Sequence, residues 1–433
     1  MKKAEILRKH REFLFPCTMH YYSEPLPLER GKGQYLWDTE GKKYLDFFGS
    51  IVTINVGHCN DEIVEKIVDQ TRKLQHTSTL FPHENLVTLA EKMARITPGN
   101  LKQSFFTNSG TEANETAVDA ARAYTGNFHV VALRHSYSGR SSLAAGLTGQ
   151  SPWKKHQAPV AGIVHAHNAY CYRCPFGRTY PSCDLICATD MKELIETTTS
   201  GSVAAFIAEP IQGVGGFITP PKEYFEITSR IVRDYGGVFI ADEVQTGFGR
   251  TGGKWFGIEQ YGVQPDLMTF AKGMANGFPI GATIARAEIA ESLRGLTLST
   301  FGGNPVAAAA ANAVIDYIER ERLVDNAAVV GDYLRQRLLE LQENHLLIGD
   351  VRGMGLMWGI ELVKDRRTKE PAPQETARIM EQAKDNGLII GKGGLYGNVL
   401  RISPPLTISR ADVDEAARLL NKTFSEVGQL AHS

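Results

Sequence analysis

Short apolar runs alternate with helical patterns from about residue 60 to residue 290. This alternation is typical of βαβ units, and it predicts an α/β fold with a mostly parallel central sheet flanked by helices. Ligands of such sheets gather at the carboxyl ends of the strands. The predicted strands are Ser104–Thr107, His129–Leu133, Ala204–Glu209, Val238–Asp242, Leu267–Ala271 and Ala282–Ala285.

The two ends of the chain show a different pattern. A long helix is predicted from Pro305 to about Val329, and the tail that follows has its own strand and helix signals. Near the N-terminus, a short helix precedes Gly33–Phe47, where alternating apolar residues flank a polar turn and predict a hairpin. We expect this hairpin to pack with the tail. The predicted division is an N-terminal segment at 1–55, a large ligand-binding domain at 56–325 and a small C-terminal domain at 326–433.

Composition narrows the class of protein. The 433 residues are 42% hydrophobic and 22% charged, as expected of an ordinary globular α/β protein. A net charge of -1 argues against general binding to nucleic acid or anionic membranes. No apolar run approaches the length that spans a bilayer. The first ten residues are basic but include Glu5 and lack an apolar core, so a cytoplasmic location is expected.

Four of the six cysteines cluster, and their spacing is C-x2-C-x8-C-x3-C. This spacing resembles a zinc knuckle, although free thiols that pack a loop and disulfides are alternatives. We interpret the cluster as local structure and expect no catalytic metal. The residues are Cys171, Cys174, Cys183 and Cys187.

Two charged residues end predicted core strands. Asp242 ends one apolar run, and Lys272 follows the next. Buried charges must pair, shift their pKa or bind something. Pyridoxal phosphate needs such a pair, because the lysine forms a Schiff base and the carboxylate keeps the pyridine nitrogen protonated. A structural Lys–Asp ion pair is the alternative.

Other residues are candidates for holding a phosphate and a flat ring. Ser109, Gly110 and Thr111 follow a predicted strand and open a helix, so their N–H and hydroxyl groups could bind phosphate, although an ordinary capped helix would look the same. Tyr137 could stack on a ring or pack the core. Val244 and Gln245 extend the Asp242 run and could contact the other ring face and a ring hydroxyl.

Glu209 and Arg401 complete the candidate charges. Glu209 closes a predicted strand, and Arg401 lies between apolar residues, where it needs a carboxylate from a side chain or a substrate. A competing motif, Gly247-Phe248-Gly249-Arg250-Thr251-Gly252, matches the dinucleotide fingerprint G-x-G-x-x-G. No helix opening follows it, so a Rossmann dehydrogenase is disfavoured.

Taken together, these motifs resemble those of class III aminotransferases, pyridoxal-phosphate enzymes of fold type I, from about residue 20 onward. The motifs that carry the resemblance are Asn108–Glu115, Glu209–Gly213, Ala241–Gly252, Ala271–Gly273, Thr300–Pro305 and Leu400–Thr407. Asp46–Thr53 and Gly349–Met357 most resemble the mitochondrial-type alanine–glyoxylate aminotransferases. Arg352–Glu370 also resembles dialkylglycine decarboxylase.

The resemblance implies further roles. Thr300 would reach the phosphate of a neighbouring subunit, which implies a homodimer with shared sites and leaves a tetramer open. Arg401 would bind the substrate carboxylate, and Glu209 would pair with it when the donor carries none. Arg140 lies where some relatives bind a distal carboxylate. Val52, with Ile51, would form an apolar wall that disfavours decarboxylation.

The expected activity is transfer of an amino group from an ω-amino acid, an amine or diamine, or alanine to a keto acid such as pyruvate or glyoxylate. Lys272 would move the proton. A decarboxylase or lyase of the same fold is one alternative, and a non-enzymatic dimeric scaffold is another. A scaffold has no reason to keep this set of buried charges.

Overall fold

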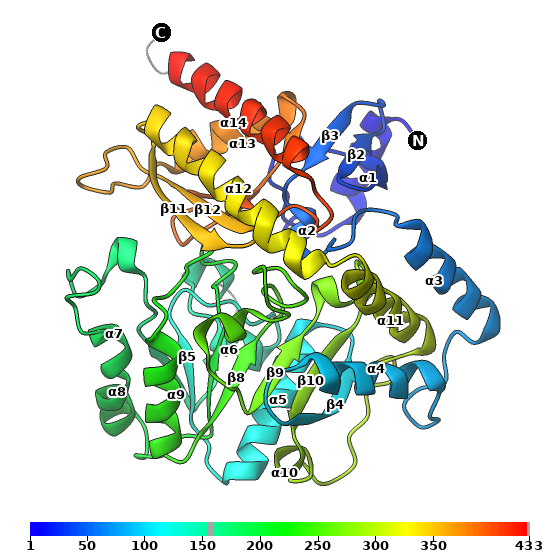
Figure 1. Cartoon of the computed structure of the whole chain (residues 1–433), viewed down its shortest axis with the longest axis vertical. Helices are drawn as coiled ribbons and strands as arrows, with labels where there is room; N and C mark the ends of the chain where they lie inside the picture. The colour runs from blue at the N-terminus through cyan, green and yellow to red at the C-terminus, as the bar shows by residue number, and fades with distance from the viewer. Residues whose placement is uncertain (155–158, 431–433) are drawn as a thin grey trace.

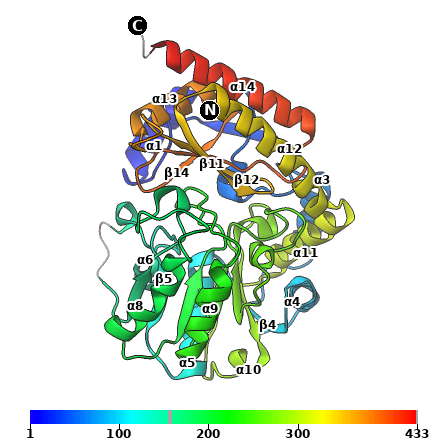
Figure 2. The ribbon, with the colours of Figure 1, turned by 60° about the vertical axis from the view of Figure 1, so that its left-hand side comes forward.

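The structure is a computed structural model that describes residues 1–154 and 159–430. Figure 1 shows a large part built on a central sheet, and above it a smaller part built from both ends of the chain. The turned view in Figure 2 keeps the same separation. None of the helices in the described residues is both long and apolar enough to cross a membrane.

The central sheet has seven strands in the order β4-β10-β9-β8-β7-β5-β6. Strand β10 is antiparallel to both of its neighbours, and the pairs from β9 to β6 are parallel. The mostly parallel sheet expected from the sequence is therefore confirmed. The strands are β4 (Leu101–Thr107), β5 (Val130–Leu133), β6 (Ile163–Ala166), β7 (Ala205–Ala208), β8 (Val238–Asp242), β9 (Leu267–Phe270) and β10 (Gly281–Arg286).

Successive side chains of the central strands enter two different cores. Phe206 and Phe239 join one hydrophobic cluster together with Phe225 of the helix α9 (Tyr224–Asp234). Ile207 and Ile240, one residue further along, join a second cluster with alanines of α5 (Gly110–Thr125). Because both faces are covered, these strands are continuous apolar runs in the sequence.

The remaining helices of the large part surround this sheet (Figure 1). They are α3 (Asp61–Lys73), α4 (Glu84–Ile96), α6 (Ser142–Leu147), α7 (Ile186–Thr189), α8 (Met191–Thr198), α10 (Ala287–Ala290) and α11 (Pro305–Arg320). Single 3-10 turns occur at Ser151–Trp153, Cys171–Arg173, Gly257–Tyr261 and Lys272–Ala275.

The smaller part contains two four-stranded sheets, with strand orders β1-β2-β3-β13 and β11-β12-β15-β14. β3 comes from the N-terminal hairpin and pairs with β13 near the C-terminus, so the expected packing of hairpin and tail is confirmed. The elements are α1 (Lys3–Phe13), β1 (Leu28–Lys32), β2 (Tyr35–Asp38), β3 (Lys43–Asp46), α12 (Leu323–Asn344), β11 (Ile348–Met354), β12 (Met357–Leu362), α13 (Pro373–Asp385), β13 (Leu388–Ile389), β14 (Gly391–Gly393), β15 (Val399–Ile402) and α14 (Arg410–Leu430).

The structure corrects the helix predicted from Pro305 to about Val329. The helix α11 ends at Arg320, and α12 starts at Leu323, because Arg322 between them has a left-handed backbone with φ of 53°. Strand β6 was absent from the prediction. The exact domain boundaries remain a prediction.

A left-handed turn, labelled α2 (Gly49–Val52), leads from β3 toward the central sheet. Gly49, Ser50, Ile51 and Val52 have φ values of 56°, 49°, 66° and 59°. Such a backbone is costly for residues with a Cβ atom, above all for β-branched ones. Asp46 begins the turn, since its Oδ1 accepts the N–H groups of Phe48 (2.9 Å) and Gly49 (3.0 Å).

Candidate active site

The carboxyl ends of the central strands bring the candidate residues to one edge of the sheet. Asp242 of β8 is paired in register with Thr269 of the adjacent strand β9. Lys272 follows Thr269 by three residues along the chain. A cavity of about 290 Å³ opens there. Nine of the predicted site residues line it: Ser109, Gly110, Thr111, Tyr137, Glu209, Asp242, Val244, Gln245 and Lys272.

Asp242 is held by a side chain that the sequence analysis missed. Asn114 donates from Nδ2 to Asp242 Oδ2 (2.9 Å), and its Oδ1 accepts from the Thr269 hydroxyl (2.7 Å). The Val244 N–H also donates to Asp242 (3.1 Å). Desolvation raises the pKa of Asp242, while the Asn114 hydrogen bond and the nearby Lys272 ammonium lower it. The signal for Asn114 was a polar residue on the buried alanine face of a helix.

Lys272 lies just beyond strand β9 in a left-handed conformation, with φ of 45°. Burial lowers the pKa of its ammonium, and the neighbouring Arg401 guanidinium lowers it further. Asp242 and Glu209 oppose this shift. A lysine with a depressed pKa offers a larger share of neutral amine, which is the nucleophilic and basic form.

The start of α5 forms the expected anion cradle. Ser109 caps the helix, because its Oγ accepts the Glu112 N–H (3.3 Å). Gly110 packs so closely on Val244 that an added Cβ would lie 2.9 Å from the valine side chain. Backbone N–H groups at a helix N-terminus favour a phosphate.

The cavity also fits a flat heterocycle. Gln245 is buried, and its Oε1 has no hydrogen-bond partner among the described residues. A buried amide oxygen in a cavity wall is suited to a ligand hydroxyl. Tyr137 and Val244 both line the same cavity. These residues fit the phosphate, ring and hydroxyl of pyridoxal phosphate.

Glu209 and Arg401 do not form the expected direct ion pair in this structure. The Glu209 carboxylate accepts the N–H groups of Tyr137 (3.0 Å) and Gly213 (2.8 Å). The Arg401 Nη1 donates to the carbonyl of the same Gly213 (3.4 Å). The two side chains therefore bind opposite ends of one residue's backbone. Burial and the Asp242 carboxylate raise the pKa of Glu209 to about 8.

Arg401 is buried without an acidic partner among the residues that the structure describes. Only 3% of its surface is exposed, and its remaining donors bind the Lys392 carbonyl (3.1 Å) and the Tyr21 hydroxyl (3.1 Å). Its guanidinium lies 5.0 Å from the Phe48 ring centre. It makes no ion pair within the described chain, so it lacks the carboxylate that such a buried charge requires.

Four predicted residues lie outside the cavity lining: Arg401, Val52, Arg140 and Thr300. Val52 is buried against Ile211, Phe217 and Met357, and its neighbour Thr53 lines the cavity instead. The predicted Val52 wall is therefore wrong, because the left-handed turn points that side chain into a core. Arg140 and Thr300 are exposed on the surface.

Two further motifs have structural roles. Arg250 of the glycine-rich motif is fully buried and donates to Asn55 Oδ1 (2.6 Å) and to carbonyls of Leu356 and Pro404. No helix follows the motif directly, so the dinucleotide alternative lacks its required context.

The cysteine cluster lines a separate, very small cavity of about 20 Å³. All six cysteines in the described residues are free thiols. No group of three or more metal-ligating side chains is arranged to hold a metal within the part of the chain that the structure describes.

Comparison with known proteins places the chain among enzymes. Residues 18–424 match the family described as aminotransferase class-III. The chain is 45% identical over 423 residues to the mitochondrial alanine–glyoxylate aminotransferase 2 homolog 2 of Arabidopsis thaliana, covering 98% of this chain and 87% of that protein. It is 41% identical over 433 residues to the leucine/methionine racemase of Thermococcus litoralis, covering 99% and 96%.

A solved structure agrees with these relatives. An amine transaminase from an uncultivated Pseudomonas species, in its pyridoxal-phosphate-bound form, has a TM-score of 0.90 and 31% identity, covering 96% of this chain and 99% of that one. The residues around the cavity fit the same cofactor. The chain belongs to the class III aminotransferases, which are pyridoxal-phosphate-dependent enzymes of fold type I.

Proposed function

We propose that this enzyme transfers the amino group of alanine, an ω-amino acid or an amine or diamine to a keto acid such as pyruvate or glyoxylate. The observation that carries the proposal is the buried Arg401 guanidinium, which has no acidic partner in the described chain and influences Lys272 electrostatically. A substrate carboxylate would supply the missing charge. The alanine–glyoxylate aminotransferase and amine transaminase relatives support this range of substrates.

The positions of the residues around the cavity indicate a role for each of them. Bound pyridoxal phosphate supplies an electron sink for the bond broken next to the substrate nitrogen. Lys272 would attach it and then move the proton, helped by its depressed pKa. Asp242 would hold the protonated ring nitrogen, and Ser109, Gly110 and Thr111 would hold the phosphate. Tyr137 and Val244 would contact the ring faces, and Gln245 its hydroxyl.

We also propose a homodimer with shared sites. Large apolar side chains are exposed in two segments, residues 80–81 and 296–301. The exposed fraction is 69% for Leu80, 64% for Phe81 and 61% for Phe301, and Leu296 is fully exposed. Exposed apolar groups of this size favour an interface. The second segment also contains Thr300, and it contacts the phosphate cradle, because Asn108 Nδ2 donates to Ser299 Oγ (3.4 Å). In such a dimer, Thr300 would reach the cofactor phosphate of the partner subunit.

Decarboxylation and racemisation are the activities to separate from transamination. The Val52 wall no longer argues against decarboxylation, since Thr53 lines the cavity in its place. The 41% identity to a leucine/methionine racemase favours racemisation as a second candidate. Racemisation needs the same lysine and cofactor but returns the proton to the original carbon without an acceptor.

The test is a nitrogen-transfer assay on the cofactor-loaded enzyme. Donors with isotopically labelled nitrogen would be incubated with pyruvate or glyoxylate, and the label would be followed into new alanine or glycine. Label in the acceptor-derived amino acid supports the proposal. Carbon dioxide or ammonia released without an acceptor, or inversion of the donor amino acid alone, would overturn it. A cytoplasmic location also remains a proposal, which cell fractionation would test.

A further inference from the structure

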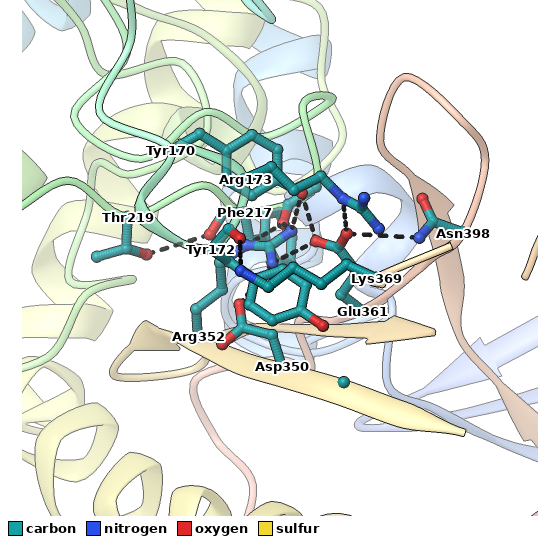
Figure 3. Close-up of polar contacts among 12 residues, drawn as sticks. Tyr170, Tyr172, Arg173, Phe217, Thr219, Asp350, Arg352, Glu361, Lys369 and Asn398 are labelled. Carbon is teal, nitrogen blue, oxygen red and sulfur yellow. Dashed lines mark hydrogen bonds and ion pairs between the residues drawn. The ribbon is translucent and has the colours of Figure 1, made fainter. Parts of the chain in front are cut away.

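A buried polar cluster joins the smaller part to the loop that carries the cysteines (Figure 3). At its centre, the carboxylate of Glu361 in β12 is fully buried and accepts from Arg352 Nη1 (2.7 Å). It also accepts from the Tyr170 hydroxyl and from Arg173 Nε, both in the loop. Several charge-assisted hydrogen bonds in a buried site fix the geometry of all their members.

Arg352 of β11 points from this cluster toward a neighbouring turn. Its Nε and Nη2 both donate to the Gly216 carbonyl, at 3.1 Å and 2.8 Å. Its Nη1 also binds Asp350 (2.7 Å), and its guanidinium lies 4.9 Å from the Tyr170 ring centre. The planar guanidinium of Arg352 is therefore held on several sides while it donates two hydrogen bonds to the Gly216 carbonyl.

This turn, residues 213–217, contacts both Arg401 and Glu209. The Gly216 N–H donates back to the Gly213 carbonyl (3.2 Å), the same carbonyl that accepts from Arg401. The Gly213 N–H binds Glu209. Phe217, at the end of the turn, places its ring centre 5.6 Å from the Arg401 guanidinium. A continuous path of contacts thus runs from Arg352 through the turn to Arg401 and Glu209.

We propose that Arg352 is a positioning residue, which fixes the 213–217 turn and thereby orients Arg401 toward a substrate carboxylate. This inference rests on the proposed function, since it takes Arg401 as the carboxylate ligand. A positioning role differs from a general structural role. If Arg352 only stabilised the fold, its substitution would impair the reaction with all substrates alike. A positioning role affects only those that present a carboxylate to Arg401.

The test is Arg352→Lys in the cofactor-loaded enzyme. Lysine keeps the charge, but one ammonium cannot reproduce the fork that binds Gly216, Asp350 and Glu361 together. We expect the KM for pyruvate to rise about tenfold or more, while the half-reaction with benzylamine, which has no carboxylate, stays within about twofold. The Kd of propionate, an unreactive carboxylate, should rise in parallel by calorimetry.

Arg366→Lys is the matched control. Arg366 also donates to backbone carbonyls of the smaller part, including those of Ile348 (2.9 Å) and His345 (3.0 Å), but does not contact the turn. We expect its propionate Kd and pyruvate KM to equal those of the wild type. Unchanged values in Arg352→Lys, or equal losses with pyruvate and benzylamine, would overturn the inference.

A second variant covers the case in which Arg352→Lys does not fold. Asp350→Asn removes one charge that orients Arg352, so the propionate Kd should rise by about threefold; an unchanged Kd would overturn the inference. A wild-type enzyme that binds propionate but moves no nitrogen to pyruvate would contradict the proposed function. In that case propionate binding by the variants still decides the role of Arg352.

Discussion

Site residues at the sheet edge were predictable where a charged side chain follows an apolar strand. Lys272 and Asp242 end apolar runs, where a charged side chain is buried at a cost in free energy unless it pairs or binds a ligand. Asn114 was not predicted, since helical periodicity alone assigns it to a core face. The position of Gly213 between Glu209 and Arg401 was not predicted, because no sequence pattern reveals an intervening backbone group.

The hydrogen bond from Asn114 to Asp242 yields a prediction about pH. Its donation lowers the pKa of Asp242, so Asn114→Ala should raise that pKa. The carboxylate form of Asp242 holds the ring nitrogen. As the pH is lowered, the variant should therefore lose activity at a higher pH than the wild type does. Losing one hydrogen bond to a charged group corresponds to a shift of about one to two pH units.

The measurement is the pH profile of kcat/KM. We expect the acid limb of Asn114→Ala to move to higher pH. Thr116→Ala, on the same helix, removes a side chain whose hydroxyl binds the Glu112 carbonyl (2.9 Å) and should leave the limb in place. An acid limb that moves to lower pH, or not at all, would contradict this account of Asp242.

At the scale of elements, the buried strands were predictable and the exceptions have physical reasons. Strand β6 lies at the edge of the sheet, is only partly buried and contains a histidine, so its apolar run is short. The break between α11 and α12 is made by Arg322, a residue that favours helices. The left-handed turn at Gly49–Val52 has no signature beyond its first glycine, since Ile and Val normally avoid that backbone.

This turn predicts a stabilising substitution. Ser50 is exposed and has φ of 49°, a conformation in which glycine bears no steric cost. We expect Ser50→Gly to raise the free energy of unfolding by up to about 1 kcal/mol, as measured by chemical denaturation. Ser425→Gly, inside α14, should instead lower it by about 0.5 kcal/mol. Destabilisation by Ser50→Gly equal to that of Ser425→Gly would show that the turn is not left-handed.

At the scale of the whole molecule, the sequence predicted the α/β class and the joining of the two chain ends. β3 and β13 come from opposite ends of the sequence and form one sheet. The path of contacts from Arg352 of the smaller part through the 213–217 turn to Arg401 could not be predicted. It depends on the hydrogen bonds from Arg352 to the Gly216 carbonyl, which join residues 136 positions apart in the sequence.

The exposed apolar segments give a prediction about assembly. Leu296→Glu combined with Phe301→Glu places charges on the proposed interface, so the dimer should dissociate and retain less cofactor. Light scattering after size-exclusion chromatography would give the mass. Leu346→Glu changes another exposed leucine, whose exposed fraction is 79%, outside those two segments, and this variant should remain dimeric. A double variant with the wild-type mass would exclude this surface as the interface.

The most direct test of the central claim is the visible spectrum of the wild type and of Lys272→Ala after incubation with pyridoxal phosphate. We predict that the wild type gains a yellow absorbance that bleaches with an amino donor and returns with pyruvate. Lys272→Ala should stay folded by circular dichroism but neither hold the cofactor through gel filtration as a covalent adduct nor complete this cycle. A colourless wild type, or a Lys272→Ala variant that cycles like the wild type, would contradict the account.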